Sequence, residues 1–143
     1  MNLHQQIAIL SQSSLDDRMK QRIQDLLPSY PGEKRDYDFY VCDMAALYVM
    51  GISNIRSVNP IVPRTPFRRR IMEENGFRQT TLQDGAFIVF NTLSGHFLHA
   101  AVALDKGYAF HKMGVSVPEI TTIEHIRSTY GTKPPHLEEY WIR

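Results

Sequence analysis

The order of apolar and polar positions divides the chain into a helical first part and a β-rich later part. Residues 3–11 have a short helical pattern, and a second one ends at Pro28. Its apolar positions recur at helical spacing: Leu15, Met19, Ile23 and Leu26. Ser14 is its predicted N-cap, because a serine hydroxyl can accept a hydrogen bond from the first turn. The apolar run at 41–49 predicts a short buried helix that ends near Gly51.

The segment after this run predicts an extended connector and then an amphipathic helix. Thr65 is placed to cap the helix, Pro66 suits its first position, and Gly76 follows its end. The positions expected to face the core are Phe67, Ile71 and Met72. The arginines and glutamates of this segment are expected on the solvent side.

The last third of the chain predicts one more helix and a closing strand. Thr121 or Thr122 is the expected cap of a helix over 123–130, which Gly131 ends. The C-terminal sequence EEYWIR has the alternation of a strand, which places Tyr140 and Ile142 on one face and Trp141 on the other.

The stretch from 84 to 113 is the strongest β signal, and it carries two histidines. Alternation in HFLHAAVAL places His99 on one strand face together with Ala101 and Ala103. The sequence GYAFHKM forms the return strand and contains His111.

The turn between these strands decides whether the two histidines can meet. Asp105-Lys106-Gly107 predicts a three-residue loop with a left-handed glycine. That register pairs Ala101 with His111 and His99 with Met113, so both histidines lie on one face roughly 7 Å apart. A two-residue loop would put them on opposite faces.

Helices that precede strands favour an α+β fold with an antiparallel sheet. The chain has 143 residues, which suits one domain, and no linker divides it. We therefore predict a single domain over 1–143. Residues 1–27 would form its N-terminal helical part and 28–143 its catalytic core.

Composition narrows the functional classes. A net charge of +1 gives no reason to expect nucleic acid as a partner. No apolar run has the roughly 20 residues of a membrane span, and the N-terminal pattern is not that of a signal peptide. These patterns predict a protein that is cytoplasmic as made, for which export would need a dedicated secretion system.

The only cysteine, Cys42, is a candidate nucleophile at the start of the predicted helix at 41–49. A helix would fit closely over Ala101 and Ala103, beside His99. The helix dipole lowers a thiol pKa there, a histidine can take the proton, and first-turn N–H groups can stabilise an oxyanion. His111 could then orient the His99 ring.

Cysteine and histidine also have two common roles outside nucleophilic catalysis. A lone cysteine is commonly a small buried hydrophobe, and this role stays open for Cys42. Zinc binding is the second role, but His96 and His99 are three apart on a strand and point to opposite faces. No second cysteine is present, so we expect no metal and no cofactor.

The order of these pieces resembles the NlpC-type cell-wall endopeptidases, a papain-like family. Tyr30, VCDMAALYVMGI, IVPRTPF, LQDGAFIVF and HAAVALDKGYAFH follow one another as the family's motifs do, over roughly residues 28–113. The resemblance implies a papain-like fold whose nucleophile helix packs on an antiparallel sheet. It also implies Cys42 as nucleophile, His99 as base and acid, His111 as the orienting residue, and Tyr30 near the oxyanion region.

Several positions depart from the family pattern. Its Asp before the cysteine is Val41 here, and its Ser and Gly after the cysteine are Asp43 and Met44. Asp43 could steer a cationic or amide substrate, or it could simply be a charge at a helix N-terminus. Arg64 is the basic residue expected nearest the cleft. These departures affect the substrate more than the mechanism.

The resemblance implies amide hydrolysis through a thioester, with a peptidoglycan stem peptide as substrate. Such a protein would be a secreted effector or lytic factor, with secretion machinery and an immunity or inhibitor protein as partners. Two alternatives keep the fold. One is a deamidase, transglutaminase or acyltransferase that acts on a host protein or lipid. The other is a non-catalytic binding module in which Cys42 is buried.

Overall fold

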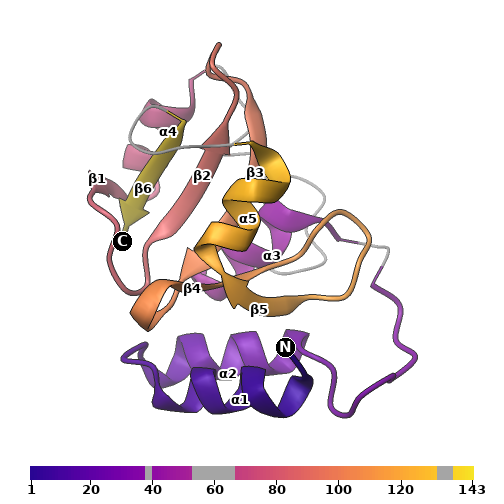
Figure 1. Ribbon diagram of the computed structural model, residues 1–143. Helices are drawn as coiled ribbons and strands as arrows, with labels where there is room; N and C mark the ends of the chain where they lie inside the picture. Colours follow the sequence, from indigo (N-terminus) through magenta and orange to yellow (C-terminus); the bar gives the residue numbers. More distant parts are fainter. Residues whose placement is uncertain (38–39, 53–66, 132–136) are drawn as a thin grey trace.

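The computed structural model describes residues 1–37, 40–52, 67–131 and 137–143. Within these ranges, five α-helices and six strands follow one another in the order shown in Figure 1. The helices are α1 (Leu3–Gln12), α2 (Asp17–Leu26), α3 (Cys42–Val49), α4 (Arg68–Glu74) and α5 (Ile123–Tyr130). The strands are β1 (Arg78–Thr80), β2 (Phe87–Asn91), β3 (Phe97–Ala103), β4 (Tyr108–His111), β5 (Glu119–Thr122) and β6 (Glu138–Ile142).

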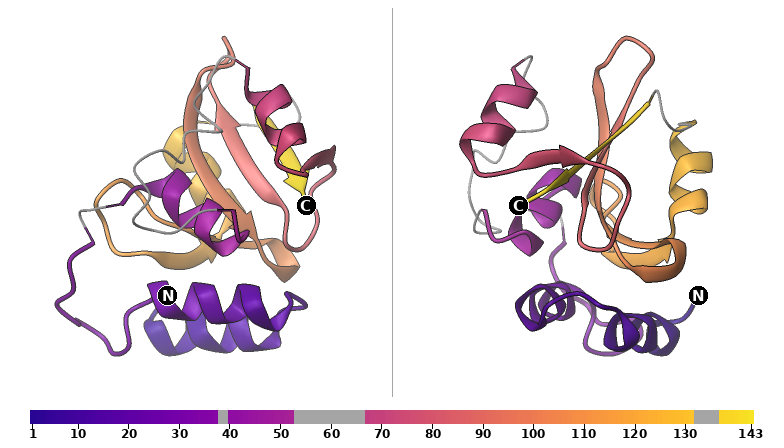
Figure 2. Two further views of the ribbon diagram at one scale, coloured as in Figure 1. Left: turned by 180° about the vertical axis from the view of Figure 1, so that it is seen from behind. Right: turned by 90° about the vertical axis from the view of Figure 1, so that its left-hand side faces the viewer.

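The strands form one open antiparallel sheet in the order β1-β6-β2-β3-β4-β5. Helix α3 lies on one face of this sheet and α5 on the other, while α1 and α2 lie side by side across one end (Figure 2). The α+β class and the antiparallel sheet are as predicted. None of the helices in the described ranges is long and apolar enough to cross a membrane.

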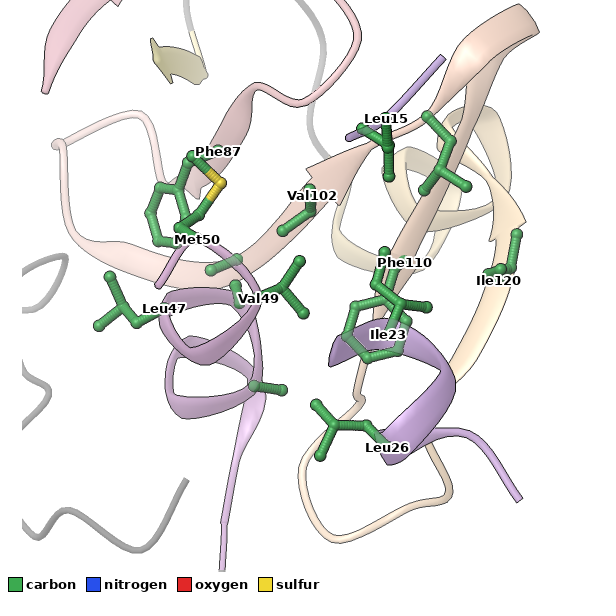
Figure 3. Packing of buried hydrophobic residues seen from close by; sticks show 14 of the residues in the cluster. Leu15, Ile23, Leu26, Leu47, Val49, Met50, Phe87, Val102, Phe110 and Ile120 are labelled. Atoms are coloured by element: carbon green, nitrogen blue, oxygen red, sulfur yellow. The ribbon is translucent and has the colours of Figure 1, made fainter. Parts of the chain in front are cut away.

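The two faces of the sheet bury separate hydrophobic clusters. On one face, Ala45, Ala46, Leu47 and Val49 of α3 pack with Phe87, Val102 and Phe110 (Figure 3). On the other, α5 contributes Ile123 and Ile126 to a cluster with alanines of β3 and β4: Ala101, Ala103 and Ala109.

This arrangement corrects one expectation. The helix that covers Ala101 and Ala103 is α5, and the helix that begins at Cys42 packs on the opposite face. Helix α3 is apolar on most of its surface, so it buries more area against the larger side chains of the other face.

The start of α2 shows a second difference. Asp16, not Ser14, is the N-cap, and its carboxylate accepts from the backbone N–H of Met19 at 2.8 Å. The hydroxyl group of Ser14 lies between the carboxylates of Asp84 and Asp105 instead. Ser14 therefore ties the helical pair to two turns of the sheet.

The amphipathic helix is shorter than predicted, with Phe67 at its N-cap, and Thr65 and Pro66 lie outside the described residues. Met72 is buried as predicted, but Phe67 is 69% exposed, which contradicts its predicted core position. Arg68 pairs with Glu139 of β6, so one arginine of this helix packs against the sheet.

The last third of the chain agrees with its prediction. Thr122 caps α5 by accepting from the backbone N–H of His125, and Gly131 ends the helix in the left-handed conformation. In β6, Trp141 packs in the α3-side cluster while Tyr140 packs on the α5 side.

Candidate functional site

Two buried histidines form the centre of the site. Ala101 pairs with His111 in the β3–β4 ladder, and Asp105–Gly107 form the three-residue loop, as the turn sequence predicted. Nε2 of His99 lies 2.9 Å from Nδ1 of His111, and the two rings are nearly perpendicular at 86°. Strand β4 ends at His111, so the expected pairing of His99 with Met113 does not form.

A carboxylate continues this contact on the next strand. Glu119 lies directly opposite His111 in the β4–β5 ladder, and its Oε1 is 2.9 Å from Nε2 of His111. This hydrogen bond holds the pKa of the Glu119 carboxyl below its usual range, although burial opposes the effect. The Glu119 side chain is 40% exposed, whereas the His111 side chain is 1% exposed. Three adjacent strands therefore contribute one chain of hydrogen bonds.

The carboxylate determines which ring nitrogens hold protons. An ionised carboxylate only accepts hydrogen bonds, so Nε2 of a neutral His111 donates to Glu119 and its Nδ1 is left as an acceptor. Nε2 of His99 then donates to that Nδ1. In the neutral pair, Nδ1 of His99 is left with its lone pair free to accept a proton.

This nitrogen has no hydrogen-bond partner among the described residues, although its side chain is fully buried. Burial, and secondarily the charge of His111, lowers the pKa of His99 to about 3. The free lone pair gives the imidazole a site that can accept a proton, but the low pKa disfavours the charged ring unless a negative charge forms beside it.

Aromatic rings enclose His99 on the α5 side of the sheet. The Phe90 ring of β2 lies 5.8 Å away between centroids and is tilted by 39°. The Tyr130 ring, at the end of α5, stacks on the imidazole at 4.4 Å with only 16° between the ring planes. These contacts hold the plane of the His99 ring.

Cys42 is the first residue of α3, and its side chain is buried, with 6% of the residue exposed. After burial, the negative charge of Cys42 is what raises the pKa of Tyr130, the same residue that stacks on His99. Cys42 begins a helix that packs on one face of the sheet, whereas the His99 ring stacks on Tyr130 on the other face.

A buried lysine explains how α3 begins near the histidines. Lys112 directly follows His111 in sequence, and its ammonium group donates to the backbone oxygen of Tyr40 at 2.7 Å. It also donates to the backbone oxygen of Gly114 and lies 4.6 Å from the centre of the Tyr40 ring. The chain that enters α3 is thus fixed beside the end of β4.

The remaining predicted site residues are Tyr30, Asp43 and Arg64, and no described contact joins any of them to the two histidines. Tyr30 lies on the loop after α2 and is 59% exposed, and none of its described contacts involves the histidines or Cys42. Asp43 is buried in the first turn of α3 beside Cys42. Arg64 lies outside the described residues.

Sequence reasoning missed Glu119, Tyr130 and Lys112. Lys112 had no clear signal, because it lies just after the last residue of β4 and strand alternation does not fix its direction. Glu119 begins a strand that borders β4, but the sequence of the connecting loop does not specify which residues of the two strands pair. Nothing in the local sequence distinguishes Tyr130 from any other tyrosine at the end of a helix.

Within the described ranges, no group of three or more His, Cys, Asp and Glu side chains is arranged to hold a metal ion. Comparisons with known protein families, with curated proteins and with solved structures found no match to the chain.

Proposed function

We propose that this protein is a cysteine hydrolase that cleaves an amide bond through a thioester. Cys42 is the nucleophile, His99 the general base and acid, and His111 the residue that orients the His99 ring. The observation that carries the proposal is the buried Nδ1 of His99, which has no hydrogen-bond partner among the described residues while its Nε2 is fixed by His111.

The first half of the reaction forms the thioester. Nδ1 of His99 takes the thiol proton as the sulfur of Cys42 attacks the substrate carbonyl carbon. The carbonyl oxygen becomes an oxyanion, which backbone N–H groups at the start of α3 can stabilise. The C–N bond then breaks, and His99 returns the proton to the leaving amine.

The second half releases the acid and restores the enzyme. His99 takes a proton from a water molecule, whose oxygen attacks the thioester carbonyl. The C–S bond breaks, the carboxylic acid leaves, and the proton returns to the Cys42 sulfur. His111 holds the required tautomer throughout, because its own Nε2–H is engaged by Glu119.

Burial indicates the resting state of the pair. A His99 pKa of about 3 leaves the imidazole neutral at neutral pH, so the pair rests as thiol and imidazole rather than as an ion pair. Proton transfer then accompanies attack on the substrate. The dipole of α3 favours the transient negative charge on Cys42.

We also propose that the α+β fold is papain-like and that the substrate is a peptidoglycan stem peptide. The support is the order of the elements: a helix that begins with the cysteine, then a hairpin that carries two histidines. A wall substrate implies a secretion system and an inhibitor protein as partners. Deamidation, transglutamination or acyl transfer would use the same three residues. Transglutamination and acyl transfer would replace water with another acceptor, and deamidation would release ammonia from a side-chain amide.

Deep burial favours one rival function, a binding module with no catalysis. Cys42 is 6% exposed and His99 is fully buried, so little of either side chain is open to a substrate. In the rival case the polar residues would only stabilise the fold.

Alkylation of Cys42 separates these functions, because the chain contains no other cysteine. For a catalytic pair we expect the rate of alkylation by iodoacetamide at neutral pH to depend on His99, which takes the thiol proton as the sulfur attacks. His99→Gln should lower it, whereas the exposed His96→Gln should leave it unchanged. A rate equal to that of free cysteine, insensitive to His99→Gln, would exclude catalysis.

The substrate is tested by digestion of purified peptidoglycan and mass analysis of the fragments. We expect new stem-peptide fragments with the wild-type protein and none with Cys42→Ala. If alkylation shows an activated thiol but no fragments form, the hydrolase mechanism stands and the wall substrate is wrong.

A further inference from the structure

A hollow lined by three arginines lies where the start of α2, the end of α3 and the end of β6 meet. Its volume is about 410 Å³. Arg18 and Arg22 come from α2, and Arg143 directly follows β6. The other lining residues are Asp16, Met19, Met50 and Gly51. None of the residues proposed for catalysis lines this arginine hollow, so it is a separate feature of the molecule.

The three arginines differ from most of the others in the described part of the chain. Five of the others each pair with a glutamate: Arg35, Arg68, Arg69, Arg70 and Arg127. Arg18, Arg22 and Arg143 form no ion pair with another described residue. Their charges are therefore available to an anion that enters the hollow.

Two of these guanidinium groups converge on the end of α3. Nη1 of Arg22 donates to the backbone oxygen of Val49 at 3.3 Å, and Nη1 of Arg143 donates to that of Gly51 at 3.3 Å. Arg22 also packs on Gly51, where an added Cβ would lie 2.9 Å from its Nη1. These contacts hold both side chains in place and leave Nε and Nη2 of each without a hydrogen-bond partner among the described residues. Arg18 precedes Arg22 by one helical turn, so both lie on one face of α2.

The charge of the hollow matches a phosphate group. Asp16 is the only acidic side chain among the described lining residues, so the three arginines leave an excess of two positive charges. A phosphate monoester carries about −1.5 to −2 charges near neutral pH, whereas a carboxylate carries one. A guanidinium group can also donate two parallel hydrogen bonds to a phosphate. Phosphate is therefore the anion that this charge excess favours.

We propose that the arginine hollow binds a small organic phosphate. The three arginines hold the phosphate group, and Met19 and Met50 line the wall against which the organic part packs. The ligand would lie at the end of α3, opposite the end that Cys42 begins. This site is independent of the proposed hydrolase function, because the two share no residue.

Titration with phenyl phosphate at constant ionic strength, followed by the NMR signals of the arginine Nε–H groups, tests the site. We expect a dissociation constant of about 1 mM or below, and weaker binding of inorganic phosphate, which has no organic part. Arg18→Gln should fold, because Arg18 has no hydrogen bond to another described residue. It should weaken binding roughly tenfold, the size of one hydrogen bond to a charged group. Arg69→Gln is the matched control, because it removes the same charge from an exposed position on α4 and should leave binding unchanged.

Removal of the opposing charge should act in the reverse direction. Asp16 caps α2 by accepting from the backbone N–H of Met19, and asparagine can make the same cap. Asp16→Asn should therefore keep the fold and tighten the binding of phenyl phosphate roughly threefold, the effect of one charge near the surface. Asp17→Asn changes the neighbouring exposed acid, which does not line the hollow, and should leave binding unchanged.

Three results would overturn the inference. Equal weakening by Arg18→Gln and Arg69→Gln would mean that phosphate responds only to the overall charge of the protein. The same conclusion would follow if Asp16→Asn and Asp17→Asn tightened binding equally. If phenyl phosphate bound no more tightly than inorganic phosphate, the organic ligand would be wrong.

Discussion

His111 lies directly opposite Glu119 in the β4–β5 ladder, with 2.9 Å between its Nε2 and the Glu119 carboxylate. The carboxylate therefore acts on His99 only through His111. A partly exposed acid on the outer strand of the sheet is thus linked by two hydrogen bonds to a fully buried histidine two strands away.

Glu119→Gln tests this control. The amide keeps the shape of the side chain, but it can donate as well as accept, so it no longer selects one tautomer of His111. We expect Cys42 alkylation at neutral pH to fall roughly fivefold, because a hydrogen bond to an ionised group is replaced by a neutral one. Glu73→Gln, an exposed change on α4, should have no effect, and an equal rate in both variants would contradict the tautomer argument.

Burial of His99 predicts that stability falls in mild acid. The folded pKa is about 3 and the ordinary value is 6.5, so below about pH 6.5 the unfolded chain binds a proton that the folded chain does not. Stability contributed by the neutral ring is complete above this pH and is lost as the pH falls toward 3. Between pH 6.5 and 5 the free energy of unfolding should drop by about 2 kcal/mol.

Urea unfolding at several pH values measures this drop. The range stops above the ordinary carboxyl pKa of Glu119, whose lowered pKa makes its own contribution decline only in stronger acid. His99→Gln should flatten the dependence over the same range. If the free energy of unfolding of the variant depends on pH as steeply as that of the wild type, the proton taken up on unfolding belongs to another group.

Lys112→Met tests the anchor that fixes the start of α3. The change keeps the length of the side chain and removes the donor to the backbone oxygens of Tyr40 and Gly114. We expect a loss of about 1–3 kcal/mol in unfolding free energy, because buried carbonyls lose their partner. Cys42 alkylation should also slow. Lys34→Met, at an exposed position, is the control, and unaltered alkylation would show that the lysine serves stability alone.

The hairpin loop sets the register of the histidines, and its backbone can be tested directly. Lys106 and Gly107 both have positive φ angles, of 59° and 82°. An added Cβ at Gly107 would touch nothing within 4 Å, so Gly107→Ala should cost about 1–2 kcal/mol through backbone strain alone. Lys106→Asn should change stability in the opposite direction, by about 0.5 kcal/mol, because asparagine tolerates this conformation. Thermal unfolding of both variants provides the comparison.

The hairpin was predictable because two local signals agreed. Alternation placed His99 on one strand face, and Asp105-Lys106-Gly107 specified the loop length that puts His111 on the same face. The cap at Thr122 and the end at Gly131 were predictable for the same reason, since each depends only on neighbouring residues.

The layer arrangement was not predictable because both faces of β3 are apolar. Alternation separates Ala101 from Val102, but it does not say which helix covers which residue. The pairing of His111 with Glu119 depends on a register that the intervening loop does not specify. The stack of Tyr130 on His99 depends on how α5 crosses the sheet, which is a property of the packed molecule.

The single thiol of the chain begins the helix of one layer, while the rings around His99 belong to the other. If His99 takes the thiol proton as proposed, the reactivity of the thiol reports on both layers without an added label. In a denaturant series, one transition in the labelling rate would mean that the two cores unfold together. Two transitions would mean that one layer opens before the other. In the His99→Gln protein, the transition whose denaturant midpoint moves would belong to the layer around His99, which shows which layer opens first.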